Sequence, residues 1–140
     1  MNVEHWMKRK LHAIAANDNL MRAWRLMMAY NIRHLPVLDE AGQLVGILSD
    51  RDIKKHALPL ESRETILARQ EHLESIRVGS VMIRNVITIA PEAPMQDAAF
   101  LLKKHRIDCL PVLRDKRLEG MVTTTDFLDY FAQTQGQPAE

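Results

Sequence analysis

Residues 46–52 read Gly46-Ile47-Leu48-Ser49-Asp50-Arg51-Asp52, and the same order of residue types returns 74 residues later as Gly120-Met121-Val122-Thr123-Thr124-Thr125-Asp126. Each run has a glycine, two apolar residues and a hydroxyl residue, followed three positions later by an aspartate. Apolar residues that lead into such a polar turn predict a strand followed by a helix. Two matching runs in register therefore predict a duplicated architecture.

We call the two hydroxyl–aspartate turns the first corner, Ser49/Asp52, and the second corner, Thr123/Asp126. A hydroxyl residue followed three positions later by an acid is typical of a capping box, and this structural interpretation accounts for either corner alone. A functional interpretation is also open, because a helix start has unpaired N–H groups and a positive dipole end that attract anions. A carboxylate nearby can accept hydrogen bonds from a sugar diol. The corners therefore suit a ribose-phosphate ligand.

Charge and composition exclude several classes of protein. A chain of 140 residues suits one compact domain or two half-domains that pack against each other. Its 19 Lys and Arg residues nearly balance its 18 Asp and Glu residues, so we expect no nucleic-acid-binding face. The one basic run, Lys8-Arg9-Lys10, is interpreted as a solvated turn.

The compartment follows from cysteine usage and hydropathy. The chain has one cysteine, Cys109, so an internal disulfide is impossible and a reducing environment is expected. Its six histidines lack paired ligand spacing, so we expect no metal site. The start lacks the apolar run of a signal peptide, and no stretch of 18 apolar residues could span a bilayer. These observations predict a cytoplasmic protein with no membrane contact.

Apolar periodicity extends the duplication to a helix in each half. One helix is predicted to begin near Asn17 or Asp18. Apolar residues at helical spacing predict its core-facing stripe, and a second stripe lies 75 residues further on. The two stripes are Leu20, Ala23, Trp24 and Met27, and Met95, Ala98, Ala99 and Leu102.

The remaining elements complete two repeats, residues 1–60 and 78–132, joined by a connecting helix or linker at 61–77 and followed by a polar tail, 133–140, expected to be disordered. Each repeat reads β-α-β-β-α. A helix should end near Pro59. The predicted fold class is therefore α/β with two pseudo-symmetric repeats. One repeat alone would bury too little apolar surface to be stable, so we expect the two repeats to pack through their sheets. The predicted strands are 11–14, 32–38 and 44–48, and 86–89, 107–113 and 118–122.

The chain resembles a tandem pair of cystathionine β-synthase (CBS) domains, often called a Bateman module. The resemblance rests on Ile32…Leu35-Pro36-Val37 with the first corner's run, and on Ile107…Leu110-Pro111-Val112 with the second corner's run. It covers about residues 3 to 132. The arrangement is also similar to stand-alone CBS-pair proteins of the acetoin-utilisation accessory type.

This resemblance implies that adenine nucleotides, or sometimes S-adenosylmethionine, bind in clefts between the repeats. The hydroxyl residue and the aspartate would hold ribose or phosphate, and the first strand of the opposite repeat would hold adenine. The first cleft would combine Ser49 and Asp52 with Val86, Ile87 and Thr88, and the second would combine Thr123 and Asp126 with Leu11, His12 and Ala13.

The two clefts are not expected to be equivalent. Arg33 and His34 precede the first Leu-Pro-Val strand, whereas Asp108 and Cys109 precede the second. A cation strengthens phosphate binding and an acid opposes it, so the first cleft is predicted to be the stronger phosphate site. The second would be weak, empty or selective for a less charged adenosine compound. His34 is equally well interpreted as a partly buried strand residue, Arg33 as a solvated one, and Cys109 as a small apolar core residue rather than a nucleophile.

The leading functional prediction is a regulatory module that senses AMP, ADP or ATP and signals to a separate protein target or through its oligomeric state. It would require no cofactor and would not be an enzyme, because the sequence shows no nucleophile with an arranged base and no phosphate loop. The alternatives are a sensor of S-adenosylmethionine-type ligands and a scaffold that binds no nucleotide. Two residues favour the scaffold: Asp108, an acid that would oppose phosphate binding, and Ala13, which stands where the second repeat has Thr88. A homodimer is expected because CBS pairs commonly dimerise and because Met21, Met28, Phe100 and Leu101 widen the apolar helix surfaces.

Overall fold

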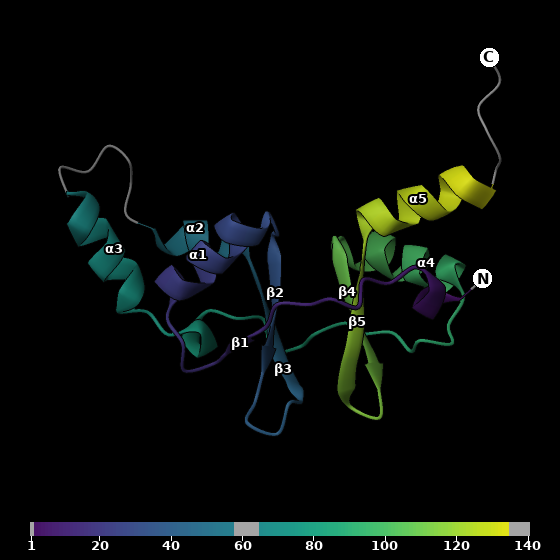
Figure 1. Ribbon diagram of the computed structural model, residues 1–140, viewed down its shortest axis with the longest axis horizontal. Helices are drawn as coiled ribbons and strands as arrows, with labels where there is room; N and C mark the ends of the chain where they lie inside the picture. The colour runs from purple at the N-terminus through teal and green to yellow at the C-terminus, as the bar shows by residue number, and fades with distance from the viewer. Residues whose placement is uncertain (1, 58–64, 135–140) are drawn as a thin grey trace, which may run out of the picture. The chain divides into compact units, whose positions relative to one another are not determined.

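The computed structural model describes residues 2–57 and 65–134 (Figure 1). The chain forms two compact units, each of which mixes helices and strands. The continuous unit runs from His12 to Val86, and the split unit joins Met1–Leu11 to Ile87–Glu140. The predicted α/β class with a duplicated set of elements is therefore confirmed.

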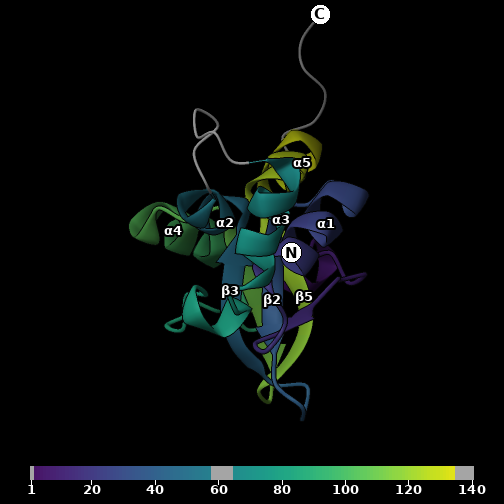
Figure 2. The same cartoon turned by 90° about the vertical axis from the view of Figure 1, so that its left-hand side faces the viewer.

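The continuous unit is built on a three-stranded sheet of order β1-β2-β3. The short strand β1 lies parallel to β2, and β2 pairs antiparallel with β3. Figure 2 shows α1 and α2 beside these strands, and Figure 1 shows α3 farther from them than α1. The elements are β1 (Ile14–Ala15), α1 (Leu20–Tyr30), β2 (His34–Leu38), β3 (Leu44–Ser49), α2 (Asp50–His56), α3 (Ile66–Glu74) and the 3-10 turn η2 (Val78–Ser80).

Helix α1 begins later than the sequence indicated. The Asn19 side chain accepts a hydrogen bond from the Arg22 N–H at 2.9 Å and caps the helix. Asp18 instead accepts a bond from the Ala15 N–H at 3.2 Å, which tightens the turn before the helix. The prediction of a start near Asn17 or Asp18 was therefore wrong by one or two residues.

The predicted stripe of α1 faces the core of the continuous unit. Leu20, Ala23 and Met27 are buried, and Trp24 packs against the same core while half-buried. Met21, which was expected to widen an outward apolar surface, is only 8% exposed. The apolar arc of α1 is thus broader than the stripe, and most of it is used inside the unit.

The split unit packs two helices on a β-hairpin. The strands β4 and β5 pair antiparallel, and α4 and α5 contact each other and the hairpin. The strand predicted at 86–89 is reduced to a single parallel bridge between Ile89 and Val112. The elements are the 3-10 turn η1 (Val3–His5), α4 (Met95–His105), β4 (Cys109–Arg114), β5 (Arg117–Thr123) and α5 (Thr124–Thr134).

The residues in front of each repeat pack in the unit that contains the other repeat. Val3 and Met7 belong to the core that contains α4 and β5 residues. Val78 and Met82 belong to the core that contains α1 and β3 residues. We call these residues, 3–10 and 78–85, the lead-in segments of the two repeats. The boundaries of the sequence duplication and of the compact units therefore differ at the lead-in segments.

The connecting helix predicted within 61–77 is present as α3 (Ile66–Glu74). Leu73 and Ile76 pack against the core, but Ile66 and Leu67 are 75% and 62% exposed. The helix predicted to end near Pro59 is α2, which ends earlier, at His56, with Ala57 as its C-cap. Most of the tail expected to be disordered lies outside the described residues, but residues 133 and 134 belong to α5. None of the helices in residues 2–57 and 65–134 has the length and apolar character needed to cross a membrane.

Candidate functional site

The first corner is a complete capping box at the start of α2. The Ser49 hydroxyl accepts a hydrogen bond from the Asp52 N–H at 3.2 Å, and Asp52 Oδ2 accepts one from the Ser49 N–H at 2.9 Å. The structural interpretation of this turn is therefore confirmed. The reciprocal bonds also fix the orientation of the Asp52 carboxylate.

The start of α2 leaves few backbone donors for an anion. The Asp50 N–H donates to the Arg33 carbonyl at 2.9 Å, and the Arg51 N–H donates to Asp50 Oδ1 at 2.9 Å. Together with the box, these bonds engage the N–H groups of residues 49 to 52. The expectation of unpaired N–H groups was wrong for the first corner, where an aspartate and a backbone carbonyl occupy them.

The second corner uses the same residue types differently. Asp126 Oδ2 accepts hydrogen bonds from both the N–H and the hydroxyl of Thr123, at 2.9 and 3.2 Å. The Thr123 hydroxyl thus donates to the carboxylate, and only half of a capping box forms. Asp126 is 6% exposed and is the one buried charged residue in the described part of the chain. Burial explains this arrangement, because a desolvated carboxylate needs hydrogen-bond donors.

Lys8 provides the cation that faces Asp126. Its Nζ lies 3.7 Å from Asp126 Oδ1, and its backbone exchanges hydrogen bonds of 2.9 and 3.0 Å with Met121 in β5. The interpretation of residues 8–10 as only a solvated turn was therefore wrong for Lys8, although its side chain is 60% exposed. No motif pointed to this contact, because the corresponding residue of the other repeat is Ile83.

Cys109 lies next to the second corner but is not a reactive thiol. It is 5% exposed, and its pKa is raised to about 12, first by burial and then by the negative charges of Asp126 and Asp108, while Lys8 lowers it. A thiol with so high a pKa is almost wholly protonated near pH 7 and is a poor nucleophile. The interpretation of Cys109 as a core residue is confirmed.

The other predicted site residues are divided between the two units. His34 begins β2 opposite Ser49, which brings it beside the first corner, whereas the Arg33 side chain is exposed. The His12 ring stacks on Tyr30 with the ring centroids 3.7 Å apart. His12, Ala13, Arg33, His34, Ser49, Asp52 and Val86 belong to the continuous unit, and Leu11, Ile87, Thr88, Thr123 and Asp126 to the split unit. The predicted groupings that join residues of both units stay predictions.

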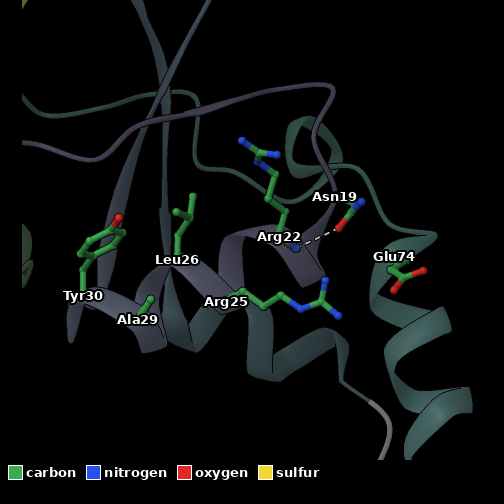
Figure 3. A pocket seen from close by; sticks show the side chains of 7 residues that line it. All are labelled: Asn19, Arg22, Arg25, Leu26, Ala29, Tyr30 and Glu74. Carbon is green, nitrogen blue, oxygen red and sulfur yellow. Dashed lines mark hydrogen bonds between the residues drawn. The ribbon is translucent and has the colours of Figure 1, made fainter.

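The continuous unit also has a surface hollow that the sequence did not indicate. Its volume is about 520 Å³, and its walls come from α1, its cap and the end of α3 (Figure 3). None of the predicted site residues lines it. The lining residues are Asn19, Arg22, Arg25, Leu26, Ala29, Tyr30 and Glu74. Across residues 2–57 and 65–134, no group of three or more His, Cys, Asp or Glu side chains could hold a metal ion.

Comparison with known proteins identifies the duplication. A family model described as "CBS domain" matches residues 3–58 and again residues 78–133. A CBS domain-containing protein of Dictyostelium discoideum is 37% identical over 131 residues, which are 91% of this chain and 88% of that protein. This relative is similar over nearly the full length of both chains.

Relatives with enzyme names are matched over a small part only. The chain is 35% identical over 117 residues to L-aspartate semialdehyde sulfurtransferase of Methanocaldococcus jannaschii, covering 83% of this chain but 20% of that enzyme. Because the chain spans about a fifth of that enzyme's length, the catalytic activity of the relative does not carry over to it.

Among solved structures, the chain resembles the CBS domain pair of protein MJ0100 in complex with 5′-methylthioadenosine and S-adenosyl-L-methionine. The TM-score is 0.79 at 30% identity, over 96% of this chain and 98% of the other. The similarity includes both repeats.

Proposed function

Since the chain belongs to the CBS domain family, we propose that it is a regulatory module that binds an adenosine-containing ligand and passes the signal to a protein target or through its oligomeric state. The proposed ligands are AMP, ADP or ATP, with ribose or phosphate held at the two corners. The ligand acts as a regulator, and the module needs no cofactor.

One observation carries this proposal: in each unit an aspartate is held by the N–H of the hydroxyl residue three positions before it. The N···O distance is 2.9 Å at both corners, which fixes the carboxylate without using all of its acceptor capacity. At the first corner this bond goes to Asp52 Oδ2 and does not use Oδ1. A ribose diol is a suitable donor to such an oxygen, because hydrogen bonds to charged acceptors are the strong ones.

Similarity to the MJ0100 domain pair supports an adenosine ligand and favours a second candidate within the same class. Both ligands of that protein, 5′-methylthioadenosine and S-adenosyl-L-methionine, contain adenosine and no phosphate. A sensor of S-adenosylmethionine-type ligands would use the same corners for ribose. In either form, Val86, Ile87 and Thr88, and Leu11, His12 and Ala13, are the residues proposed to contact adenine. Only in the nucleotide form would Arg33 and His34 lie toward a phosphate at the first corner.

A thermal-shift screen with AMP, ADP, ATP and S-adenosylmethionine tests the proposal on the full chain. A ligand present at 100 times its Kd stabilises the native state by about 2.7 kcal/mol, a readily measured rise in melting temperature. Asp52→Ala and Asp126→Ala should each reduce this rise. Asp97→Ala is the matched control, because Asp97 is an exposed acid in the first turn of α4 and should leave the rise unchanged.

The outcome separates binding from capping. Loss of a cap alone lowers the melting temperature without ligand and leaves the ligand-induced rise intact. If none of the four compounds raises the melting temperature of the wild-type protein, the adenosine-sensing function is refuted. The bonded N–H groups at the start of α2 would then favour the scaffold that binds no nucleotide.

We also propose that the module is a homodimer. Phe100 on α4 and Leu128 and Phe131 on α5, two helices that contact each other, are 64%, 60% and 54% exposed. Large exposed apolar side chains on neighbouring helices are typical of an interaction surface. Leu101 does not belong to this surface, because it packs against the core of the split unit. Light scattering at micromolar concentration should report twice the monomer mass, and a monomer would contradict the proposal.

A further inference from the structure

The two corners differ in the charge that faces the aspartate. At the second corner, Lys8 Nζ lies 3.7 Å from Asp126 Oδ1. The backbone of Lys8 is anchored to Met121 by two hydrogen bonds, so the base of the side chain is fixed beside the end of β5. The fold therefore places the Lys8 backbone where its ammonium group can reach the second corner.

The structure supplies an internal comparison for this position. Ile83 exchanges hydrogen bonds of 3.0 and 2.9 Å with Ile47 in β3, as Lys8 does with Met121 in β5. Ile83 lies 75 residues after Lys8 and is therefore its counterpart in the other repeat. Ile83 is apolar and 51% exposed, so this position brings no cation to Asp52.

The local charges follow from these contacts. At the first corner, Asp50 pairs with Lys54 at 3.7 Å, and no ion pair to Asp52 forms within residues 2–57 and 65–134. Among the described residues, the aspartate of the second corner therefore has a paired cation, Lys8, and the aspartate of the first corner has none. The sequence prediction of phosphate preference rested on Arg33 and His34 against Asp108 and Cys109. The Arg33 and Asp108 side chains are both exposed, so mobile ions and water screen their charges. His34 is half-buried in β2 opposite Ser49.

The geometry of the Lys8–Asp126 pair leaves the ammonium available to a ligand. A separation of 3.7 Å is longer than an N–H···O hydrogen bond, and the Lys8 side chain is 60% exposed. The four-carbon stem can swing while the backbone stays bound to Met121. An anionic ligand group can thus take Lys8 as a partner while Asp126 keeps its bonds from Thr123.

We infer that Lys8 makes the second corner select adenosine ligands that carry a 5′-phosphate, whereas the first corner, with Ile83 in its place, favours adenosine ligands without a negative charge. This reverses the assignment that the motifs alone suggested. The inference rests on the proposed function, because it names which member of the ligand class each corner takes.

Isothermal titration of the full chain with AMP and with 5′-methylthioadenosine tests this inference. The two ligands share adenosine and differ at the 5′ position. In an Asp52→Ala background, which isolates the second corner, Lys8→Met should weaken AMP binding roughly tenfold, as expected for losing a charge-assisted contact at a partly exposed site. Binding of 5′-methylthioadenosine should change less than twofold, and Lys8→Arg should retain AMP binding.

Two further variants complete the design. Lys10→Met is the matched control, because it removes an exposed lysine from the same lead-in segment and should leave both affinities unchanged. In an Asp126→Ala background, which isolates the first corner, Ile83→Lys should strengthen AMP binding and not that of 5′-methylthioadenosine. Circular dichroism and melting temperatures check that each variant is folded.

The results separate failure of this inference from failure of the proposed function. If the wild-type protein binds neither ligand, the proposed function and this inference both fail. If it binds, but Lys8→Met weakens both ligands equally or strengthens AMP, the inference alone is overturned, because Lys8 would then act as a structural or occluding group.

Discussion

Met7 and Lys8 of the first lead-in segment lie against Gly120 and Met121 in β5. Gly120→Ala therefore tests this part of the fold. A Cβ at Gly120 would lie 2.8 Å from the Lys8 carbonyl oxygen, and 2.6 and 2.8 Å from Sδ and Cγ of Met7. At separations below 3.0 Å, either the new Cβ or the Met7 and Lys8 atoms that it meets must shift. The Lys8 oxygen is backbone and accepts the Met121 N–H at 3.0 Å, so it cannot yield without weakening that bond.

The expected cost can be worked from these contacts. Overpacking a well-packed site costs about 1–3 kcal/mol, and a weakened backbone hydrogen bond adds about 1 kcal/mol. We therefore expect Gly120→Ala to lower the free energy of unfolding by about 3 kcal/mol. An unfolding entropy of about 2.1 cal/mol/K per residue gives a fall of roughly 10 °C in melting temperature for a chain of this length.

Gly46→Ala is the matched comparison in the other repeat. There the separations below 3.0 Å, at 2.5 and 2.9 Å, involve only the flexible Met82 side chain, and the nearest backbone atom, the Ile83 oxygen, is 3.1 Å away. The expected loss is about 1–2 kcal/mol, because Met82 can rotate. Gly42→Ala serves as a strain control, since it meets no atom within 4 Å but has φ of +81° and should cost about 1 kcal/mol.

Urea denaturation and calorimetry of the three variants measure these losses. The expected order of destabilisation is Gly120→Ala, then Gly46→Ala, then Gly42→Ala. A Gly120→Ala protein as stable as the wild type, or more stable than Gly46→Ala, would show that the first lead-in segment does not lie against β5 as described.

Three further predictions concern single side chains. Ser49→Ala should lower the melting temperature by about 3 °C, because it removes about 1 kcal/mol of helix capping. Ser49→Thr should melt near the wild type, since threonine can also cap. Equal melting temperatures for the wild type and both variants would contradict the capping box. Burial raises the pKa of the Cys109 thiol from 9.0 to about 12, so as pH rises the thiol ionises in the unfolded chain before it does so in the folded one. The stability that the protonated thiol contributes should therefore be fully present below pH 9, and the free energy of unfolding should fall by about 1.4 kcal/mol per pH unit above it. Cys109→Ala should lack this loss in a urea titration across pH 8–11, and a wild type with the same pH dependence would count against the buried thiol. Met7→Ala should destabilise by about 2–5 kcal/mol, and Met28→Ala by less than about 0.5 kcal/mol, because Met7 is 7% and Met28 59% exposed; similar melting of both variants would place Met7 outside the core.

Local features could be predicted from the sequence because their partners are near in the chain. Ser49 and Asp52 are three residues apart, so a short-range pattern reports their capping box. The periodic stripe of α1 and the strand before each corner depend on the same kind of neighbour relations. The sequence alone thus determined the duplication, the α/β class and the first corner's local geometry.

Features that depend on the path of the chain were decided only by tertiary structure. Lys8 and Asp126 lie at opposite ends of the sequence, and no periodicity links a lead-in lysine to a helix-start aspartate. Burial of Asp126, which turns the Thr123 hydroxyl toward the carboxylate, likewise depends on residues distant in the chain. Hydrogen bonds between sequence neighbours can be read from spacing, whereas ion pairs and desolvation depend on which distant segments the core brings together.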